Sequence, residues 1–198
     1  TEVKYGEHTI SFQRPWKRIS MYEAIKEYTG TDISVMDENA LRELAIRLNI
    51  ETHPASGRGK LIDDIYKKYV RDDIINPLFM IDHPVELSPL AKRREDNPAY
   101  VERFQLLCAG GNELCNAFTE LNDPLDQEAR FKEQMELRAA GDEDSMPYDE
   151  DFVTALKHGL PPTAGLGMGI DRLVKLLANA PNLKEVILFP TLKPEQKR

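Results

Sequence analysis

A short segment in the middle of the chain, residues 110–123, restricts the possible folds more than any other. It begins with Gly110-Gly111-Asn112, a turn typical of a β-hairpin, and this turn lies between two apolar runs at residues 104–109 and 113–121. The two runs are therefore predicted to form neighbouring antiparallel strands. The second run and the residues after it carry polar side chains that a buried strand rarely holds: Glu113, Asn116, Glu120, Asn122 and Asp123. A buried carboxylate needs a cation, a metal or a cavity.

The alternation of a strand places Asn116, Phe118 and Glu120 on one face. An amide, an aromatic wall and a carboxylate in a row are suited to a small cationic ligand. A solvent-facing edge strand would show the same alternation, so both interpretations stay open. Glu113 has the opposite parity to Asn116, and the two can serve one site only if the strand is bulged near Cys115.

A second unusual segment has glycine at three alternate positions, Gly165, Gly167 and Gly169, and continues into Asp171-Arg172. Glycines allow the backbone to approach a flat ligand or phosphates, and a helix predicted at residues 173–178 would add free N–H groups. The spacing matches neither the Walker nor the dinucleotide pattern. The segment taken alone is a glycine-rich turn, and tight packing of a strand against a helix explains its glycines equally well.

The rest of the chain indicates an α+β protein. Residues 20–70 are predicted to form three helices, of which the first has a capping box at Ser20 and Glu23 and ends before Gly30. Further helices are expected from Asp123-Pro124 to residue 141 and at residues 149–158. Residues 3–12 are predicted to form a hairpin with Gly6 near its turn, and residues 78–82 and 186–189 are predicted to be strands. Helices interleaved with antiparallel hairpins favour α+β over a doubly wound parallel sheet.

Composition limits the functions further. Among 198 residues, 26 are Lys or Arg and 34 are Asp or Glu, and the net charge of −8 argues against a basic nucleic-acid binder. No run approaches the ~18 apolar residues of a membrane helix and no basic-apolar leader opens the chain, so a cytoplasmic protein without a membrane partner is expected. Cys108 and Cys115 are predicted to be reduced core residues. The histidines share no metal-like spacing and are predicted in loops or at the surface: His8, His53, His83 and His158.

Taken in order, residues 83–92, 113–124, 159–162 and 165–172 resemble the class II lysyl-tRNA synthetases. The resemblance covers essentially the whole chain, including residues 12–18 and 186–190. Residues 165–172 look like motif 3, which the aspartyl and asparaginyl enzymes share. The Ser-Pro-Leu-Ala-Lys loop at residues 88–92 and the Asn116…Glu120 strand are similar to the lysyl branch.

The resemblance implies a class II aminoacyl-tRNA synthetase fold, an antiparallel sheet flanked by helices. Residues 1–198 would be the C-terminal part of the catalytic domain, with a helical insertion at about 20–70 and motif 3 at about 160–190. The anticodon-binding domain, motif 1 and motif 2 are not found in the sequence. The expected function is that of a lysine–tRNA ligase, which forms lysyl-adenylate from lysine and ATP and transfers the lysyl group to tRNA(Lys). A homodimer is implied for the full enzyme.

The resemblance also implies roles for individual residues. Asn116 would hold the lysine carboxylate, Glu120 the ε-ammonium group, and Phe118 would line the side-chain channel. Glu113 would bind Mg²⁺ at the ATP phosphates, and Leu114 would contribute backbone near the nucleotide. The expected ATP-binding motif consists of Gly169, Ile170, Asp171 and Arg172, with Arg172 as the catalytic residue.

One departure from the family concerns the metal. The strand before the hairpin places Gln105 where the family usually has a second metal-binding glutamate, with about one extra residue before Glu113. A neutral amide is a weaker ligand for Mg²⁺, so Gln105 is a candidate ligand only. Because motif 2 supplies the arginine for the α-phosphate, this segment is expected to be weakly active or inactive alone. The alternatives are a non-catalytic paralogue that binds lysine or a nucleotide, and a relative that lysylates a translation factor.

Overall fold

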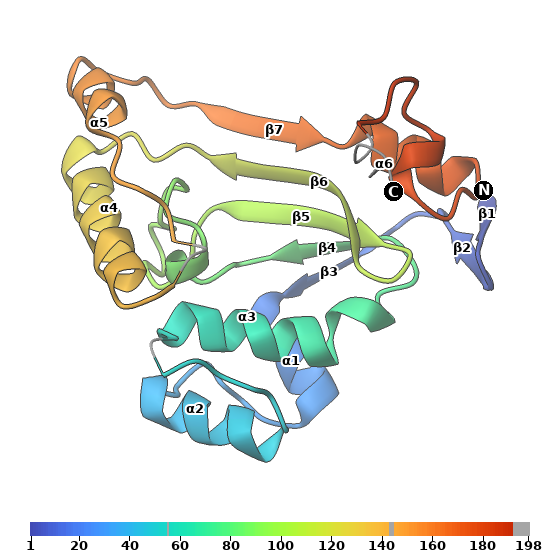
Figure 1. Ribbon diagram of the computed structural model, residues 1–198, viewed down its shortest axis with the longest axis horizontal. Helices are drawn as coiled ribbons and strands as arrows, with labels where there is room; N and C mark the ends of the chain where they lie inside the picture. Colours follow the sequence, from blue (N-terminus) through green and yellow to red (C-terminus); the bar gives the residue numbers. More distant parts are fainter. Residues whose placement is uncertain (55, 143–144, 192–198) are drawn as a thin grey trace, which may run out of the picture.

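The computed structural model describes residues 1–54, 56–142 and 145–191, and it centres on a five-stranded sheet (Figure 1). The strands lie in the order β3-β4-β5-β6-β7. Their bounds are Lys17–Ser20 for β3, Leu78–Ile81 for β4, Arg103–Cys108 for β5, Asn112–Thr119 for β6 and Ala164–Met168 for β7. β3 and β4 are parallel and the other neighbours are antiparallel. The predicted α+β class, with a largely antiparallel sheet and flanking helices, is confirmed.

Three helices cover one side of the sheet at its β3–β4 end: α1 (Met21–Thr29), α2 (Glu38–Arg47) and α3 (Arg58–Tyr69). The predicted capping box of α1 is present, since Ser20 and Glu23 bond reciprocally, and the helix ends at Gly30 with φ of 71°. Asp37 caps α2 through its side chain. Apolar residues of these helices form one core with Leu107 of β5 and Met80 of β4.

The opposite face of the sheet has its own, smaller core. There Leu106, Cys108 and Leu114 pack with Leu176 of α6 (Ile170–Leu177) and with Ile10. Ile10 lies in β2 (His8–Ser11), which pairs with β1 (Glu2–Tyr5) as the predicted hairpin. Cys108 and Cys115 are buried free thiols, as expected. Because the two cores anchor opposite faces, the side-chain direction along β5 and β6 is fixed.

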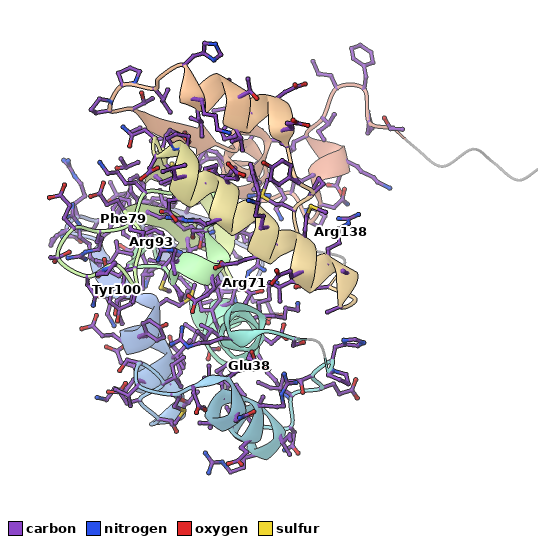
Figure 2. The ribbon with its side chains drawn as sticks, turned by 90° about the vertical axis from the view of Figure 1, so that its left-hand side faces the viewer. Glu38, Arg71, Phe79, Arg93, Tyr100 and Arg138 are labelled. Carbon is purple, nitrogen blue, oxygen red and sulfur yellow. The ribbon has the colours of Figure 1, made fainter. Side chains whose placement is uncertain are left out.

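Helices α4 (Pro124–Ala139) and α5 (Glu150–Lys157) lie together at the far end of the sheet from α6. Asp123 caps α4 and Pro124 occupies its first turn, as predicted. In the side view of Figure 2, α4 crosses in front of the sheet with α1–α3 below it. Short 3-10 turns complete the elements at Arg71–Asp73, Val85–Leu87 and Leu183–Glu185. No helix in the described ranges is long and apolar enough to cross a membrane.

Two predicted elements are wrong. The glycine-rich segment is not a turn, since residues 164–168 form β7 and the helix that follows starts at Ile170 rather than Leu173. Residues 186–189 do not form a strand, and Leu188 and Phe189 are 89% and 92% exposed. An apolar run becomes a strand only where another strand pairs with it, and the described residues offer this run none.

The bulge predicted near Cys115 is confirmed. Leu106 pairs with Cys115 whereas Leu107 pairs with Glu113, so Leu114 is the extra residue on β6. Residues directly opposite each other share a face of the sheet. The bulge therefore brings Glu113 to the same face as Asn116, despite their odd separation.

Candidate functional site

One face of β5, β6 and β7 gathers most of the residues singled out from the sequence. Arg103 and Gln105 lie on this face of β5, and Glu113 and Asn116 on β6. A cavity of about 430 Å³ opens beside them between β6, β7 and the start of α6. It is lined by Glu113, Leu114, Asn116, Gly167, Met168, Gly169, Asp171, Arg172 and Leu183.

Glu113 contacts both an amide side chain and a basic side chain at this cavity. Its carboxylate accepts a hydrogen bond from the Gln105 amide, and its Oε1 lies 3.7 Å from Nη1 of Arg172. The same Nη1 donates to the Glu113 carbonyl at 2.8 Å. The backbone N–H of Gly169 donates to the Leu114 carbonyl at 2.9 Å, which fastens the start of α6 to the bulge. An exposed cation beside a carboxylate is thereby held at the mouth of the cavity.

Of the other residues of the predicted ATP motif, two line this cavity and one does not. Gly169 precedes α6 and Asp171 lies in its first turn, both lining the cavity. Ile170 is 60% exposed, so its side chain contributes little to the cavity wall. Glycines next to the start of a helix leave the backbone N–H groups uncovered, and such groups can bind phosphates.

His83 lies behind Gln105, in a loop as the prediction of a loop or surface position allows, but it is buried. It is 1% exposed, and its Nε2 is 3.0 Å from Oε1 of Gln105. Burial lowers the pKa of His83 to about 3, and the neighbouring positive charge of Arg103 adds to this effect. A neutral imidazole therefore donates from Nε2 to the Gln105 oxygen, and this turns the Gln105 amide nitrogen toward Glu113.

Arg103 is a residue of this face that the sequence analysis did not identify. It lies two positions before Gln105 on β5, and its Nε donates to Oδ1 of Asn116 at 2.9 Å. The strand alternation that groups Asn116 with Glu120 also groups Arg103 with Gln105, so a signal was available.

Glu120 follows β6 directly, and its place depends on a glycine of the neighbouring strand. A Cβ atom at Gly165 would lie 2.3 Å from Oε1 of Glu120, so the carboxylate occupies the space that any side chain at position 165 would fill. Burial raises the pKa of Glu120. Gly165 pairs with Phe118 and Gly167 with Asn116, which leaves the β7 side of this face open.

Phe118 and Glu120 lie further along β6 than the 430 Å³ cavity. Phe118 lines a neighbouring cavity of about 690 Å³ together with Gly165, Ala117 and Phe104. The remaining polar residues of the sequence segment have structural roles: Asp123 caps α4, and Asn122 donates to the Leu160 carbonyl at 3.3 Å.

A metal ion has few protein ligands here. Within the described ranges, no group of three or more His, Cys, Asp or Glu side chains is arranged to hold one. Mg²⁺ commonly binds through one or two carboxylates and completes its shell with substrate phosphates and water, so Glu113 alone fits such an ion. Gln105 as a ligand stays a prediction, since its oxygen faces His83 and its nitrogen faces Glu113.

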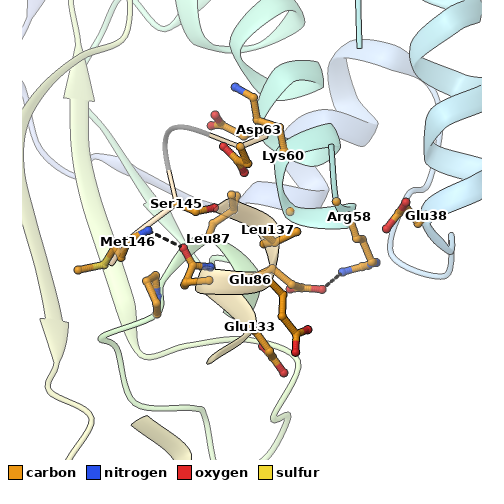
Figure 3. Close-up of a pocket in the computed structure, with 16 residues that line it drawn as sticks. Glu38, Arg58, Lys60, Asp63, Glu86, Leu87, Glu133, Leu137, Ser145 and Met146 are labelled. Atoms are coloured by element: carbon orange, nitrogen blue, oxygen red, sulfur yellow. Dashed lines mark hydrogen bonds and ion pairs between the residues drawn. The ribbon is translucent and has the colours of Figure 1, made fainter. Parts of the chain in front are cut away.

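A separate cavity of about 590 Å³ lies between the start of α3 and α4 (Figure 3). Carboxylates dominate its lining, and Arg58 pairs with Glu86 across it at 2.6 Å. None of the predicted lysine-binding, ATP-binding or metal-binding residues lines this cavity.

Comparisons with known proteins identify the family. The profile of the class II tRNA synthetases (D, K and N) matches residues 1–193. Proteins named lysine–tRNA ligase from Porphyromonas gingivalis, Thermoanaerobacter pseudethanolicus and Aquifex aeolicus are each 48% identical to the chain. These alignments cover 98–100% of the chain and 34%, 39% and 33% of those relatives respectively.

The chain belongs to the class II tRNA synthetase family of the aspartyl, lysyl and asparaginyl type. The three relatives described above are all named lysine–tRNA ligase. The chain spans about a third of the length of these relatives.

Proposed function

We propose that the residues along β6 and around the 430 Å³ cavity form the lysine-binding site and part of the ATP-binding site of a lysine–tRNA ligase. The observation that carries the proposal is the row of Asn116, Phe118 and Glu120 beside the glycines of β7. This row offers an amide at one end, an apolar ring in the middle and a carboxylate at the other end. The similarity to proteins named lysine–tRNA ligase supports the same substrate.

The spacing of the row suits free lysine. Asn116 and Glu120 are four residues apart along an extended chain, about 13 Å at ~3.3 Å per residue. This length is comparable with that of an extended lysine that makes a hydrogen bond at each end. The Glu120 carboxylate would receive the ε-ammonium group, and the Phe118 ring would lie along the methylene chain.

ATP would occupy the 430 Å³ cavity next to this row, with its phosphates near Arg172 and the start of α6. The lysine carboxylate would attack the α-phosphorus, forming the C–O–P bond of lysyl-adenylate while the bond to the β-phosphate breaks and pyrophosphate leaves. The chain's own residues would bind and align the two reactants, and Arg172 would balance the charge of the phosphates.

Mg²⁺ at Glu113 would neutralise part of the charge of the ATP phosphates. Before ATP binds, Arg172 and the Gln105 amide satisfy the Glu113 carboxylate. The proposed function also includes transfer of the lysyl group to tRNA(Lys). We further propose that the enzyme is a homodimer and is located in the cytoplasm. The oligomeric state is tested by analytical ultracentrifugation. We expect residues 1–198 on their own to be weakly active or inactive in pyrophosphate exchange.

The charge of Glu120 provides the test of the proposed function. We expect Glu120→Gln to raise the dissociation constant for lysine about 10- to 100-fold, because a charge-assisted hydrogen bond is lost, and to leave that for ATP unchanged. Isothermal titration calorimetry with each ligand measures both constants, and lysine-dependent ATP–pyrophosphate exchange measures turnover.

Glu128→Gln is the matched control, because Glu128 pairs with Lys132 on α4, away from the site. Failure of the unmodified protein to bind lysine would contradict the proposal. Binding of lysine and ATP by the protein that carries this segment, with no exchange under any condition, would instead favour the non-catalytic alternative.

A further inference from the structure

Arg103 makes contacts that tie the lysine-binding face to the loop before β5. Its Nε donates to Oδ1 of Asn116 at 2.9 Å. Its Nη1 donates to the Leu87 carbonyl at 3.0 Å and to Oγ of Ser88 at 2.9 Å. Ser88 is 5% exposed, so the guanidinium is held between a buried loop and the amide of Asn116.

This geometry determines which end of the Asn116 amide faces the cavity. A guanidinium has only donors, so the atom of Asn116 that meets Arg103 must be the oxygen. The amide nitrogen, with its two N–H donors, then points away from Arg103. Asn116 lines the 430 Å³ cavity, so those donors are available to an acceptor bound there.

Without Arg103 the amide would be free to rotate by half a turn. Its oxygen would then face the ligand, and two acceptors would meet where a donor and an acceptor are needed. Arg103 also places a positive charge beside Asn116, whereas Glu120, four residues further along the chain, carries a negative charge. The two ends of the row therefore differ in charge, as do the two ends of lysine in its bound orientation.

We propose that Arg103 is a positioning residue, which orients the Asn116 amide as a donor and thereby makes the site selective for amino acids with a free carboxylate. The inference rests on the proposed function, because it takes lysine as the ligand. Arg103 acts through Asn116 and the loop at Ser88, without touching the substrate itself.

The test compares lysine with cadaverine, which has the same chain and ammonium group but lacks the carboxylate. We expect Arg103→Met to weaken lysine binding about tenfold or more, the usual effect of losing a hydrogen bond to a charged group. Binding of cadaverine and of ATP is expected to stay within about twofold, the scatter of a substitution that leaves contacts intact. Calorimetry measures all three ligands, with cadaverine also followed by competition against lysine.

Three further variants make the test specific. Arg42→Met is the matched control, because Arg42 on α2 pairs with Glu38 and donates to the Ser56 carbonyl, away from β5 and β6. In an Asn116→Ala background, Arg103→Met is expected to cause no further loss, because the two residues act as one unit. Ser88→Ala removes one acceptor of Arg103 with little change in volume, and we expect a smaller loss that is again confined to lysine. Ser88→Ala carries the test if Arg103→Met fails to fold by circular dichroism.

Equal losses for lysine and cadaverine, or additive losses in the double variant, would overturn the positioning role. So would unchanged lysine binding in Arg103→Met. These outcomes differ from a failure of the proposed function, in which the unmodified protein does not bind lysine at all.

Discussion

Gly165 leaves the space in which the Glu120 carboxylate lies. A methyl group at this position would come within 2.3 Å of Oε1 of Glu120. The atom in conflict is the end of a flexible side chain, so the fold accommodates the change by moving the carboxylate. The position of a charge in the site is thus determined by a residue that has no side chain.

We therefore expect Gly165→Ala to lower the affinity for lysine about tenfold, because the displaced carboxylate no longer meets the ammonium group. The melting temperature should change little. Calorimetry with lysine and a thermal denaturation curve measure the two effects. In a Glu120→Ala background the conflict is absent, and there Gly165→Ala is expected to have no effect on lysine binding. A tenfold loss in that background as well would contradict the explanation.

At the scale of elements, α4 is held to the loop at residues 88–93 by a buried charged network. Arg130 is 3% exposed and donates to the carbonyls of Ser88 and Ala91, and it pairs with Asp126 at 2.7 Å. Arg93 pairs with the same carboxylate at 3.3 Å. Since Ser88 also holds Arg103, the anchoring of α4 and the orientation of the site share one loop.

The Asp126 carboxylate makes this network sensitive to acid. Burial alone would raise the pKa of Asp126, but hydrogen bonds and charge from Arg130 and Arg93 outweigh it and lower the pKa. A lowered pKa in the folded state stabilises the fold above the ordinary value of 3.8. This stabilisation is lost as the pH falls below that value.

We expect Asp126→Asn to lower the free energy of unfolding by about 2–3 kcal/mol at pH 7, because it leaves the buried Arg130 charge without its partner. The difference from the unmodified protein should narrow below pH 4, because Asp126 becomes protonated first in the unfolded state, where its pKa is higher, and then in the folded state. Urea denaturation at pH 7 and pH 3.5 measures it. Glu128→Gln, which removes the solvent-screened ion pairs with Lys132 and Lys157, should destabilise the fold much less at either pH. A difference independent of pH would refute the assignment to the Asp126 charge.

At the scale of the whole molecule, β7 and α6 carry several exposed apolar side chains. Leu166, Ile170 and Leu177 are 65%, 60% and 58% exposed. Strand β7 is the last strand of the sheet in the described residues, so one of its edges has no neighbour there. Apolar surface gathered on neighbouring elements differs from the scattered exposed residues that most surfaces carry.

We therefore expect this chain to bind the hydrophobic dye ANS in its folded state. Leu166→Lys combined with Leu177→Lys should remove most of the fluorescence increase without altering the circular dichroism spectrum. Val35→Lys is the control, because Val35 is 89% exposed but lies far along the chain, between α1 and α2. Equal dye binding by the double variant would contradict the assignment of this surface.

Prediction from sequence succeeded where the determining contacts are local. The capping box of Ser20 and Glu23, the turn before β6 and the bulge at Leu114 each follow from residues a few positions apart. The burial of His83 was missed because it depends on Gln105, a residue 22 positions away on another strand. Residues 186–189 were assigned to a strand on their apolar character alone.

The candidate site was likewise predicted only in part. The alternation along β6 grouped Asn116, Phe118 and Glu120 correctly on one face. The residues that hold them in place were not identified, because Arg103 and Gly165 act across strands through the register of the sheet. A glycine in particular shows its role only when the atoms around the missing side chain are known.

The extra residue at Leu114 has a consequence for how the sequence tolerates insertions and deletions. Removing Leu114 would straighten β6 and leave Glu113 two positions from Asn116, so both side chains would stay on one face, whereas removing Ala117 would turn Phe118 to the face opposite Asn116. A length change in the turn at residues 110–111 would leave the pairing after the bulge intact. We expect a library of single-residue deletions to retain the fold and ligand binding more often at the turn and at position 114 than at position 117, even though these sites are only a few residues apart.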